Sequence, residues 1–71
     1  MDKLELAKKI GRNIKMIRKE KGISQAELGR ICFKDKQAIE KIENGKVNPT
    51  AYSLYQIATA LKIDPVELWK F

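Results

Sequence analysis

The sequence predicts an all-α fold, a compact bundle of five helices that forms one domain over residues 1–71. Apolar residues recur at three- and four-residue spacings, which is the periodicity of helices with one buried face. Residues that commonly begin or end helices stand at the borders of these stretches. No stretch has the alternating pattern of a strand, and a chain with 44% apolar residues is just large enough for one core.

The first helix is expected from about Leu4 to Lys21. Its apolar stripe consists of Leu6, Ala7, Ile10, Ile14 and Ile17. Gly22 should end the helix, because glycine adopts the left-handed conformation without a steric penalty. Gly11 lies inside the helix at a cost of roughly 1 kcal/mol relative to alanine, which indicates a close packing contact or a frayed first segment.

Two short helices should follow, separated by a tight turn. Ser24 begins the first of them and forms a capping box with Glu27, three residues later. Asp35 is expected to cap the next helix, which ends at the Asn44–Gly45 pair.

The last two helices also have clear starting residues. Thr50 should cap the fourth helix. The segment Asp64-Pro65, with Glu67 two residues further on, places a cap, a proline at the first helical position and an acid at the third. A short fifth helix is therefore expected to end near the C-terminal aromatic residues.

The net charge of +6 is unevenly distributed along the chain. Residues 1–46 hold 13 of the 15 basic and seven of the nine acidic residues, and with them the whole net charge. This asymmetry favours an anionic partner for the first part of the chain. The alternative is an ordinary solvated helix face.

Several classes of function are disfavoured by composition. The single Cys32 and the absence of histidine argue against an intrachain disulfide and against a metal site, and Cys32 is expected to be a small buried hydrophobe. The chain has no convincing nucleophile–base pair and no glycine-rich phosphate loop, so we expect neither an enzyme nor a cofactor. Without a signal peptide or a long apolar span, a cytoplasmic location is expected.

Four motifs in order make the chain resemble the Cro/cI-type helix-turn-helix regulators, also called the XRE-like family. They are Ser24-Gln25-x-Glu27-Leu28, Ile39-x-x-Ile42-Glu43-Asn44-Gly45, Asn48-Pro49-Thr50 and Ile57-Ala58-x-Ala60-Leu61. The resemblance runs from about residue 10 to residue 68. It implies that the second and third helices form the helix-turn-helix, with the third in the major groove of DNA and the second across the backbone.

The third helix carries the residues that the resemblance places against bases, namely Lys36, Gln37 and Lys41. Lysine can bond guanine, and glutamine can bond adenine through two atoms. The alternatives are solvated lysines on an exposed helix and a Gln37 side chain bonded to the local backbone.

Other positions match the family's backbone contacts. Gln25, at the start of the second helix, and Asn44 and Lys46, just beyond the third, correspond to residues that bind phosphate. The resemblance also implies a buried ion pair between Arg18 and Glu43, which would join the first helix to the third.

The turn between the second and third helices departs from the family pattern. Where the family usually has glycine and a small apolar residue, this chain has Phe33 and Lys34. Either the turn has another geometry, or Phe33 fills the apolar position while Lys34 points outward to a phosphate.

Aromatic residues gather near the C-terminus. We expect Val66, Trp69 and Phe71 to form an exposed patch that pairs with a second copy, although Trp69 could instead fill the core. Tyr52 and Tyr55 could also donate to phosphate.

The expected function is that of a small dimeric transcriptional regulator, a repressor, bound to double-stranded DNA at a palindromic operator. Its two reading helices would lie about 34 Å apart, one turn of the duplex. No membrane association and no small-molecule effector are implied. The alternative is an antitoxin-like or restriction–modification controller subunit that acts mainly through a protein partner. Membrane-surface binding by the first helix is disfavoured, because the core needs its apolar stripe.

Overall fold

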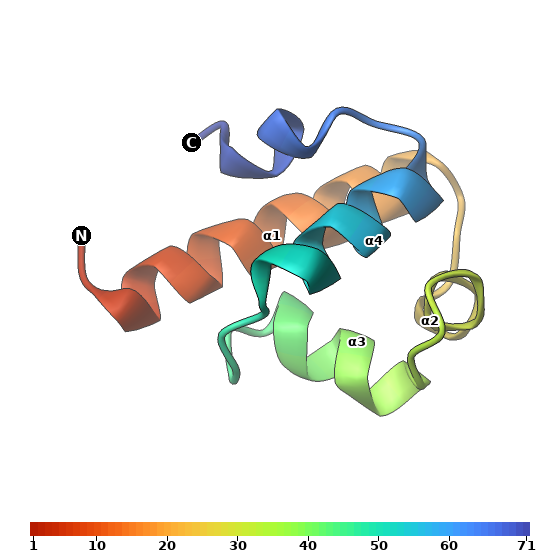
Figure 1. Ribbon diagram of the computed structural model, residues 1–71, viewed down its shortest axis with the longest axis horizontal. Coiled ribbons are helices and arrows are strands. Elements are labelled where there is room, and N and C mark those ends of the chain that lie inside the picture. Colours follow the sequence, from red (N-terminus) through yellow and green to blue (C-terminus); the bar gives the residue numbers. More distant parts are fainter.

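The computed structural model describes residues 1–71 as four α-helices and one short 3₁₀ helix, without strands (Figure 1). The elements are α1 (Lys3–Glu20), α2 (Gln25–Ile31), α3 (Lys36–Glu43), α4 (Ala51–Leu61) and η1 (Pro65–Trp69). The all-α prediction is confirmed, and the prediction of a fifth α-helix is wrong. None of the helices combines the length and the hydrophobicity that a membrane span requires.

The last element begins after the predicted cap, Asp64, but it is a five-residue 3₁₀ helix. The Asp64 side chain accepts from the Val66 N–H at 3.0 Å, and the Glu67 N–H donates to the Asp64 carbonyl at 2.9 Å. That backbone bond spans three residues, as in a 3₁₀ helix. The backbone is extended again at Lys70, so the element ends after five residues, before an α-helix could propagate.

Each α-helix begins after a residue whose side chain accepts a backbone N–H three positions ahead. These caps are Asp2, Ser24, Asp35 and Thr50, with bonds of 2.7–3.0 Å. Such caps satisfy N–H groups that have no partner inside the helix. The caps predicted at Ser24, Asp35 and Thr50 are confirmed, but Glu27 does not bond back to Ser24, so only half of the capping box forms.

The core lies where α1, α2, α3 and α4 meet, and η1 closes it with Leu68. Its buried side chains are Ile10, Ile14, Leu28, Cys32, Ile39, Ile42, Leu54, Ile57, Ala58, Leu61 and Leu68. Leu68 is fully buried while Trp69 is 47% exposed, so the alternative in which Trp69 fills the core is wrong.

The backbones of α1 and α3 touch at Gly11. A Cβ atom at this position would lie 2.4 Å from the Ile42 carbonyl oxygen and 2.6 Å from that of Glu43. Gly11 therefore marks a close packing contact and not a frayed segment. The contact fixes the carboxyl end of α3 against the middle of α1.

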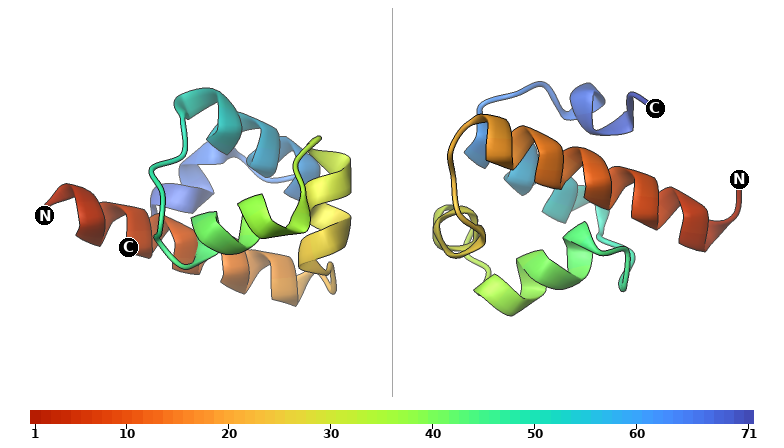
Figure 2. Two further views of the ribbon diagram at one scale, coloured as in Figure 1. Left: turned by 90° about the horizontal axis from the view of Figure 1, so that it is seen from below. Right: turned by 180° about the vertical axis from the view of Figure 1, so that it is seen from behind.

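The helices frame α3 on one side of the molecule. Seen from below in Figure 2, α3 occupies the middle, with α1 along one edge, α4 along the other and α2 across one end. η1 lies on the opposite side of the domain from α3 (Figure 1). The fold thus leaves one long side of α3 open to a partner.

Candidate nucleic-acid interface

The solvent-facing side of α3 carries all three residues predicted to contact bases. Ile39, Ile42 and Glu43 are buried on the inner side of the helix. Lys36, Gln37, Glu40, Lys41 and Asn44 follow the outer side, and all except the half-buried Glu40 are exposed. The three predicted base-contacting side chains, Lys36, Gln37 and Lys41, are therefore brought together on one open surface.

The turn before α3 has a left-handed residue that is not glycine. Phe33 has φ of 59° and is 91% exposed, while Leu28 and Cys32 are buried in the hydrophobic core. The expectation that Phe33 would fill an apolar position is wrong, and so is the expectation of another turn geometry. A left-handed residue costs roughly 1–2 kcal/mol, which the fixed contact between α2 and α3 must offset.

That contact between α2 and α3 is made through Gly29. The Lys34 N–H donates to the Gly29 carbonyl at 2.7 Å, and a Cβ on Gly29 would lie 2.5 Å from the Lys34 carbonyl oxygen. The backbone of α2 at Gly29 therefore lies directly against the backbone of the turn that leads into α3. This contact sets the direction in which α3 leaves the turn.

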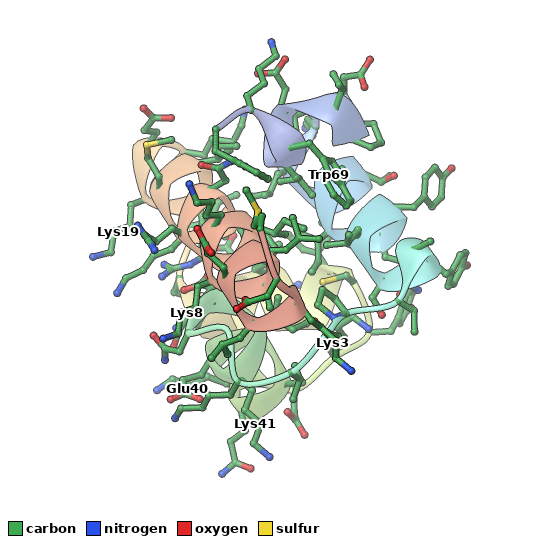
Figure 3. The ribbon with its side chains drawn as sticks, turned by 90° about the vertical axis from the view of Figure 1, so that its left-hand side faces the viewer. Lys3, Lys8, Lys19, Glu40, Lys41 and Trp69 are labelled. Atoms are coloured by element: carbon green, nitrogen blue, oxygen red, sulfur yellow. The ribbon has the colours of Figure 1, made fainter.

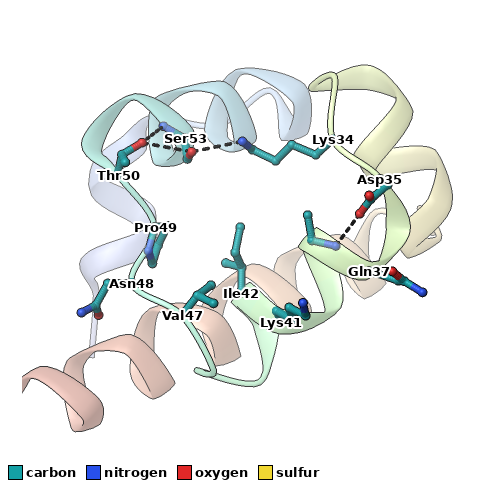
Figure 4. A pocket seen from close by; sticks show the side chains of 11 residues that line it. Lys34, Asp35, Gln37, Lys41, Ile42, Val47, Asn48, Pro49, Thr50 and Ser53 are labelled. Carbon is teal, nitrogen blue, oxygen red and sulfur yellow. Dashed lines mark hydrogen bonds between the residues drawn. The ribbon is translucent and has the colours of Figure 1, made fainter.

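Lys34 ties the turn to the start of α4. Its Nζ donates to the Ser53 Oγ at 3.1 Å, and the Thr50 hydroxyl donates to the same oxygen at 3.0 Å (Figure 4). Lys34 is half-buried, so the sequence expectation of a side chain directed fully outward does not describe its position.

A groove of about 360 Å³ runs between α3 and the segment that leads into α4. Its lining includes donors from both sides, among them Gln37, Lys41, Asn48, Thr50 and Ser53 (Figure 4). Sequence reasoning missed Asn48 and Ser53 as candidate contacts. Asn48 belongs to a family motif that was available as a signal, whereas nothing in the sequence points to Ser53.

Arg18 and Glu43 form a buried, two-pronged ion pair. Arg18 Nε and Nη2 donate to Glu43 Oε2 and Oε1 at 2.6 and 3.0 Å, and Nη1 donates to the Ile23 carbonyl at 2.9 Å. The bond to Glu43 raises the pKa of Arg18 above its ordinary value. Gln25 Nε2 adds a bond of 3.0 Å to Glu43 Oε1, so this carboxylate joins α1, α2 and α3.

Two residues predicted to bind phosphate, Asn44 and Lys46, share one acceptor. Asn44 Nδ2 and Lys46 Nζ donate to Glu40 Oε1 at 3.1 and 3.0 Å. The bond from Lys46 lowers the pKa of the Glu40 carboxyl, so the cluster contains a carboxylate at neutral pH. Sequence reasoning missed Glu40, because a carboxylate on a helix that faces DNA is not a typical phosphate or guanine contact.

Cys32 is buried beneath the turn. Its thiol donates to the Leu28 carbonyl at 2.8 Å, and burial raises its pKa. The prediction that Cys32 is a small buried residue is confirmed.

Two exposed apolar surfaces flank the domain. One, the C-terminal surface, contains the residues predicted for dimerisation: Val66, Trp69 and Phe71 are 47–53% exposed, on η1 and beyond it. The other, the α4 surface, is defined here by Phe33, Tyr52 and Tyr55. The two tyrosine rings stack with centroids 6.1 Å apart, and a groove of about 330 Å³ joins them to Phe33.

Two short helices locked around a tight turn, the second with a polar and cationic outer side, define a helix-turn-helix DNA-binding domain. Residues 14–68 match the helix-turn-helix family. The chain is 35% identical over 65 residues to y4dJ of Sinorhizobium fredii, described as an uncharacterized HTH-type transcriptional regulator; the match covers 92% of this chain and 84% of y4dJ. The protein belongs to this family of DNA-binding transcriptional regulators.

Solved structures show the same architecture. The restriction–modification controller protein C.AhdI from Aeromonas hydrophila superposes with a TM-score of 0.91 at 31% identity, over 96% of this chain and 99% of that one. The clp gene regulator ClgR from C. glutamicum gives a TM-score of 0.88 over 90% of this chain and 83% of that one. Its identity of 19% makes that likeness one of fold alone.

Proposed function

We propose that the protein binds a specific operator sequence by placing α3 in the major groove. The observation that carries the proposal is the outer side of α3, where Lys36, Gln37 and Lys41 stand together without a covering element. An eight-residue helix is about 12 Å long, and the major groove is about 12 Å wide. Lysine and glutamine supply the donors that guanine and adenine accept there.

Backbone contacts are proposed for residues that surround α3. Gln25 stands at the N-terminus of α2, where the helix dipole favours an anion. Lys34 lies before α3 and lines the groove beside it, and Asn44 and Lys46 lie after α3. Their attraction to phosphate is independent of sequence and weakens with salt, so these contacts would position the protein while α3 selects the site.

We further propose a homodimer on a palindromic operator, with half-sites about ten base pairs apart. Joining two copies through the C-terminal surface would place their α3 helices at opposite ends of the dimer, because η1 and α3 lie on opposite sides of the domain (Figure 1). The α4 surface borders α3 through Phe33, two residues before that helix's cap. The position of the α4 surface beside α3 thus favours it as the dimer interface. The alternative interface is the C-terminal surface, which contains Val66, Trp69 and Phe71.

Charge and area support a second copy at the α4 surface. Lys62 is the one charged residue that lines its groove, so two copies meet there with little repulsion. Phe33, Tyr52 and Tyr55 expose 91%, 67% and 56% of their surface. At roughly 150–250 Å² per aromatic side chain, each copy offers on the order of 400 Å², about half of a standard interface. A contact of this size suits a dimer that forms mainly on DNA.

The test is selection of binders from a random duplex library, followed by two alanine variants. Wild-type protein is expected to enrich an inverted repeat. Gln37→Ala should relax base preference at one position of each half-site, whereas Lys34→Ala should weaken all sites alike and reduce the salt slope by about 1. Salt-sensitive binding without an enriched motif would contradict sequence-specific recognition. An unchanged ranking of sites with Gln37→Ala would show that Gln37 is not one of the base-contacting residues.

Repression is the proposed outcome of binding, because a small domain bound to a promoter obstructs access of the transcription machinery to it.

A second candidate function is favoured by the likeness to C.AhdI, whose description names a restriction–modification controller and whose chain is matched over 99% of its length. In that case the protein would act as a controller subunit with a protein partner. A promoter–reporter assay separates a fall from a rise in transcription, and a stable complex with a co-purified polypeptide would favour the partner-dependent function.

A further inference from the structure

Glu40 occupies an unexpected place on the helix proposed to read DNA. Residues three and four positions apart on a helix are neighbours, so Gln37, Glu40, Lys41 and Asn44 form one continuous row on the outer side of α3. Figure 3 shows Glu40 and Lys41 projecting from this helix away from the rest of the domain. A carboxylate in such a row faces the same groove as the donors beside it.

The Glu40 carboxylate is oriented by two bonds to the same oxygen. Asn44 Nδ2 and Lys46 Nζ both donate to Oε1, and Oε2 has no hydrogen-bond partner. The Glu40 side chain is 38% exposed. One oxygen is therefore held by the protein, and the other is free to accept from a ligand.

We propose that Glu40 is a specificity-determining residue whose free Oε2 accepts a hydrogen bond from the N4 amino group of a cytosine in each half-site. Carboxylates pair with this amino group in the major groove, whereas guanine and thymine present acceptor oxygens that a carboxylate repels. The inference rests on the proposed function, because it requires α3 to lie in the groove.

A purely structural role explains the position of Glu40 less well. An exposed ion pair such as Glu40–Lys46 contributes little to stability. Its carboxylate would also repel the DNA backbone at every site and would reduce the positive charge that Lys46 offers to phosphate. A base contact explains this arrangement. Repulsion by the carboxylate weakens binding to every DNA sequence, and the hydrogen bond to cytosine restores the affinity for the correct site.

The experiment repeats the duplex selection with wild-type protein, Glu40→Gln and Glu40→Ala. Wild type should prefer cytosine at one half-site position by at least about fivefold, the low end for a specific base contact. Glu40→Ala should lose that preference, and Glu40→Gln should shift it toward adenine, the base that an amide side chain pairs with. Thermal melting checks that each variant is folded.

Glu20→Gln is the matched control, because it removes the same charge from an exposed residue of α1 that makes no side-chain hydrogen bond. It should leave the base ranking unchanged. A wild-type motif without a cytosine preference, or an unchanged motif in both Glu40 variants, overturns the inference while the proposed function stands. If wild type enriches no motif, the proposed function fails and the inference fails with it.

Discussion

Single residues determine how α3 is held against its neighbouring helices. Glu43 is the last residue of α3, and its buried carboxylate accepts bonds from Arg18 on α1 and Gln25 on α2. A buried charge is tolerated only when it is paired and bonded. One carboxylate therefore links α3 to both neighbouring helices.

Arg18→Ala should lower the free energy of unfolding by about 3–5 kcal/mol, because it leaves the buried Glu43 charge without its partner. Urea unfolding measures the change. Arg12→Ala is the control, since Arg12 is exposed and makes no ion pair, and it should stay within about 0.5 kcal/mol. Where Arg18→Ala remains folded, its ranking of DNA sites should match wild type. An unchanged melting temperature would contradict the structural role of the pair.

Cys32 should make the protein less stable at alkaline pH. An unfolded thiol ionises near pH 8.5, whereas burial raises the pKa of Cys32 in the folded protein. Between these two values the unfolded chain has lost a proton that the folded chain keeps, so stability falls as pH rises. Melting curves from pH 7.5 to 10 should therefore fall more steeply for wild type than for Cys32→Ala. Parallel curves would show that the thiol titrates alike in both states.

At the scale of whole elements, the close packing of α1 against α3 requires a residue without a side chain at Gly11. Gly11→Ala removes a poor helix former, which alone would stabilise α1 by about 1 kcal/mol. The added Cβ would however lie 2.4 Å from the Ile42 carbonyl oxygen, and overpacking of this kind costs roughly 1–3 kcal/mol.

The expected net result for Gly11→Ala is a loss of stability of up to about 2 kcal/mol, measured by urea unfolding, together with weaker DNA binding as α3 shifts. Met16→Ala tests helix propensity at an exposed position of the same helix and should be nearly neutral. A stabilised Gly11→Ala would mean that α1 and α3 can separate without cost.

The elements were predictable from sequence where the determining contacts are local. Ser24, Asp35 and Thr50 each cap a helix through an N–H only three residues away, and such spacing is visible in the chain. Asp64 gave the same signal, but the backbone becomes extended at Lys70, and the residues between them form a 3₁₀ helix instead of an α-helix. The bond from Lys34 to Ser53 spans 19 residues, and no local pattern indicates it.

On the scale of the whole molecule, the faces of the domain differ in chemistry. The outer side of α3 is polar and cationic, and the α4 surface beside it is aromatic. Phe33 stands at the border of the two. A glycine at this position would relieve the left-handed strain. A contact between the exposed Phe33 ring and a second copy would account for a phenylalanine at this strained position.

Phe33→Gly should therefore separate stability from assembly. Relief of the left-handed conformation gains roughly 1–2 kcal/mol and the greater freedom of unfolded glycine takes back about 0.5–1 kcal/mol, so the monomer should be slightly more stable in urea. Binding to a single half-site should be unchanged, whereas the preference for a full palindrome should fall, as measured by titration of both duplexes. Phe71→Ala is the matched change on the C-terminal surface: if it abolishes that preference while Phe33→Gly keeps it, two copies meet through Val66, Trp69 and Phe71 instead.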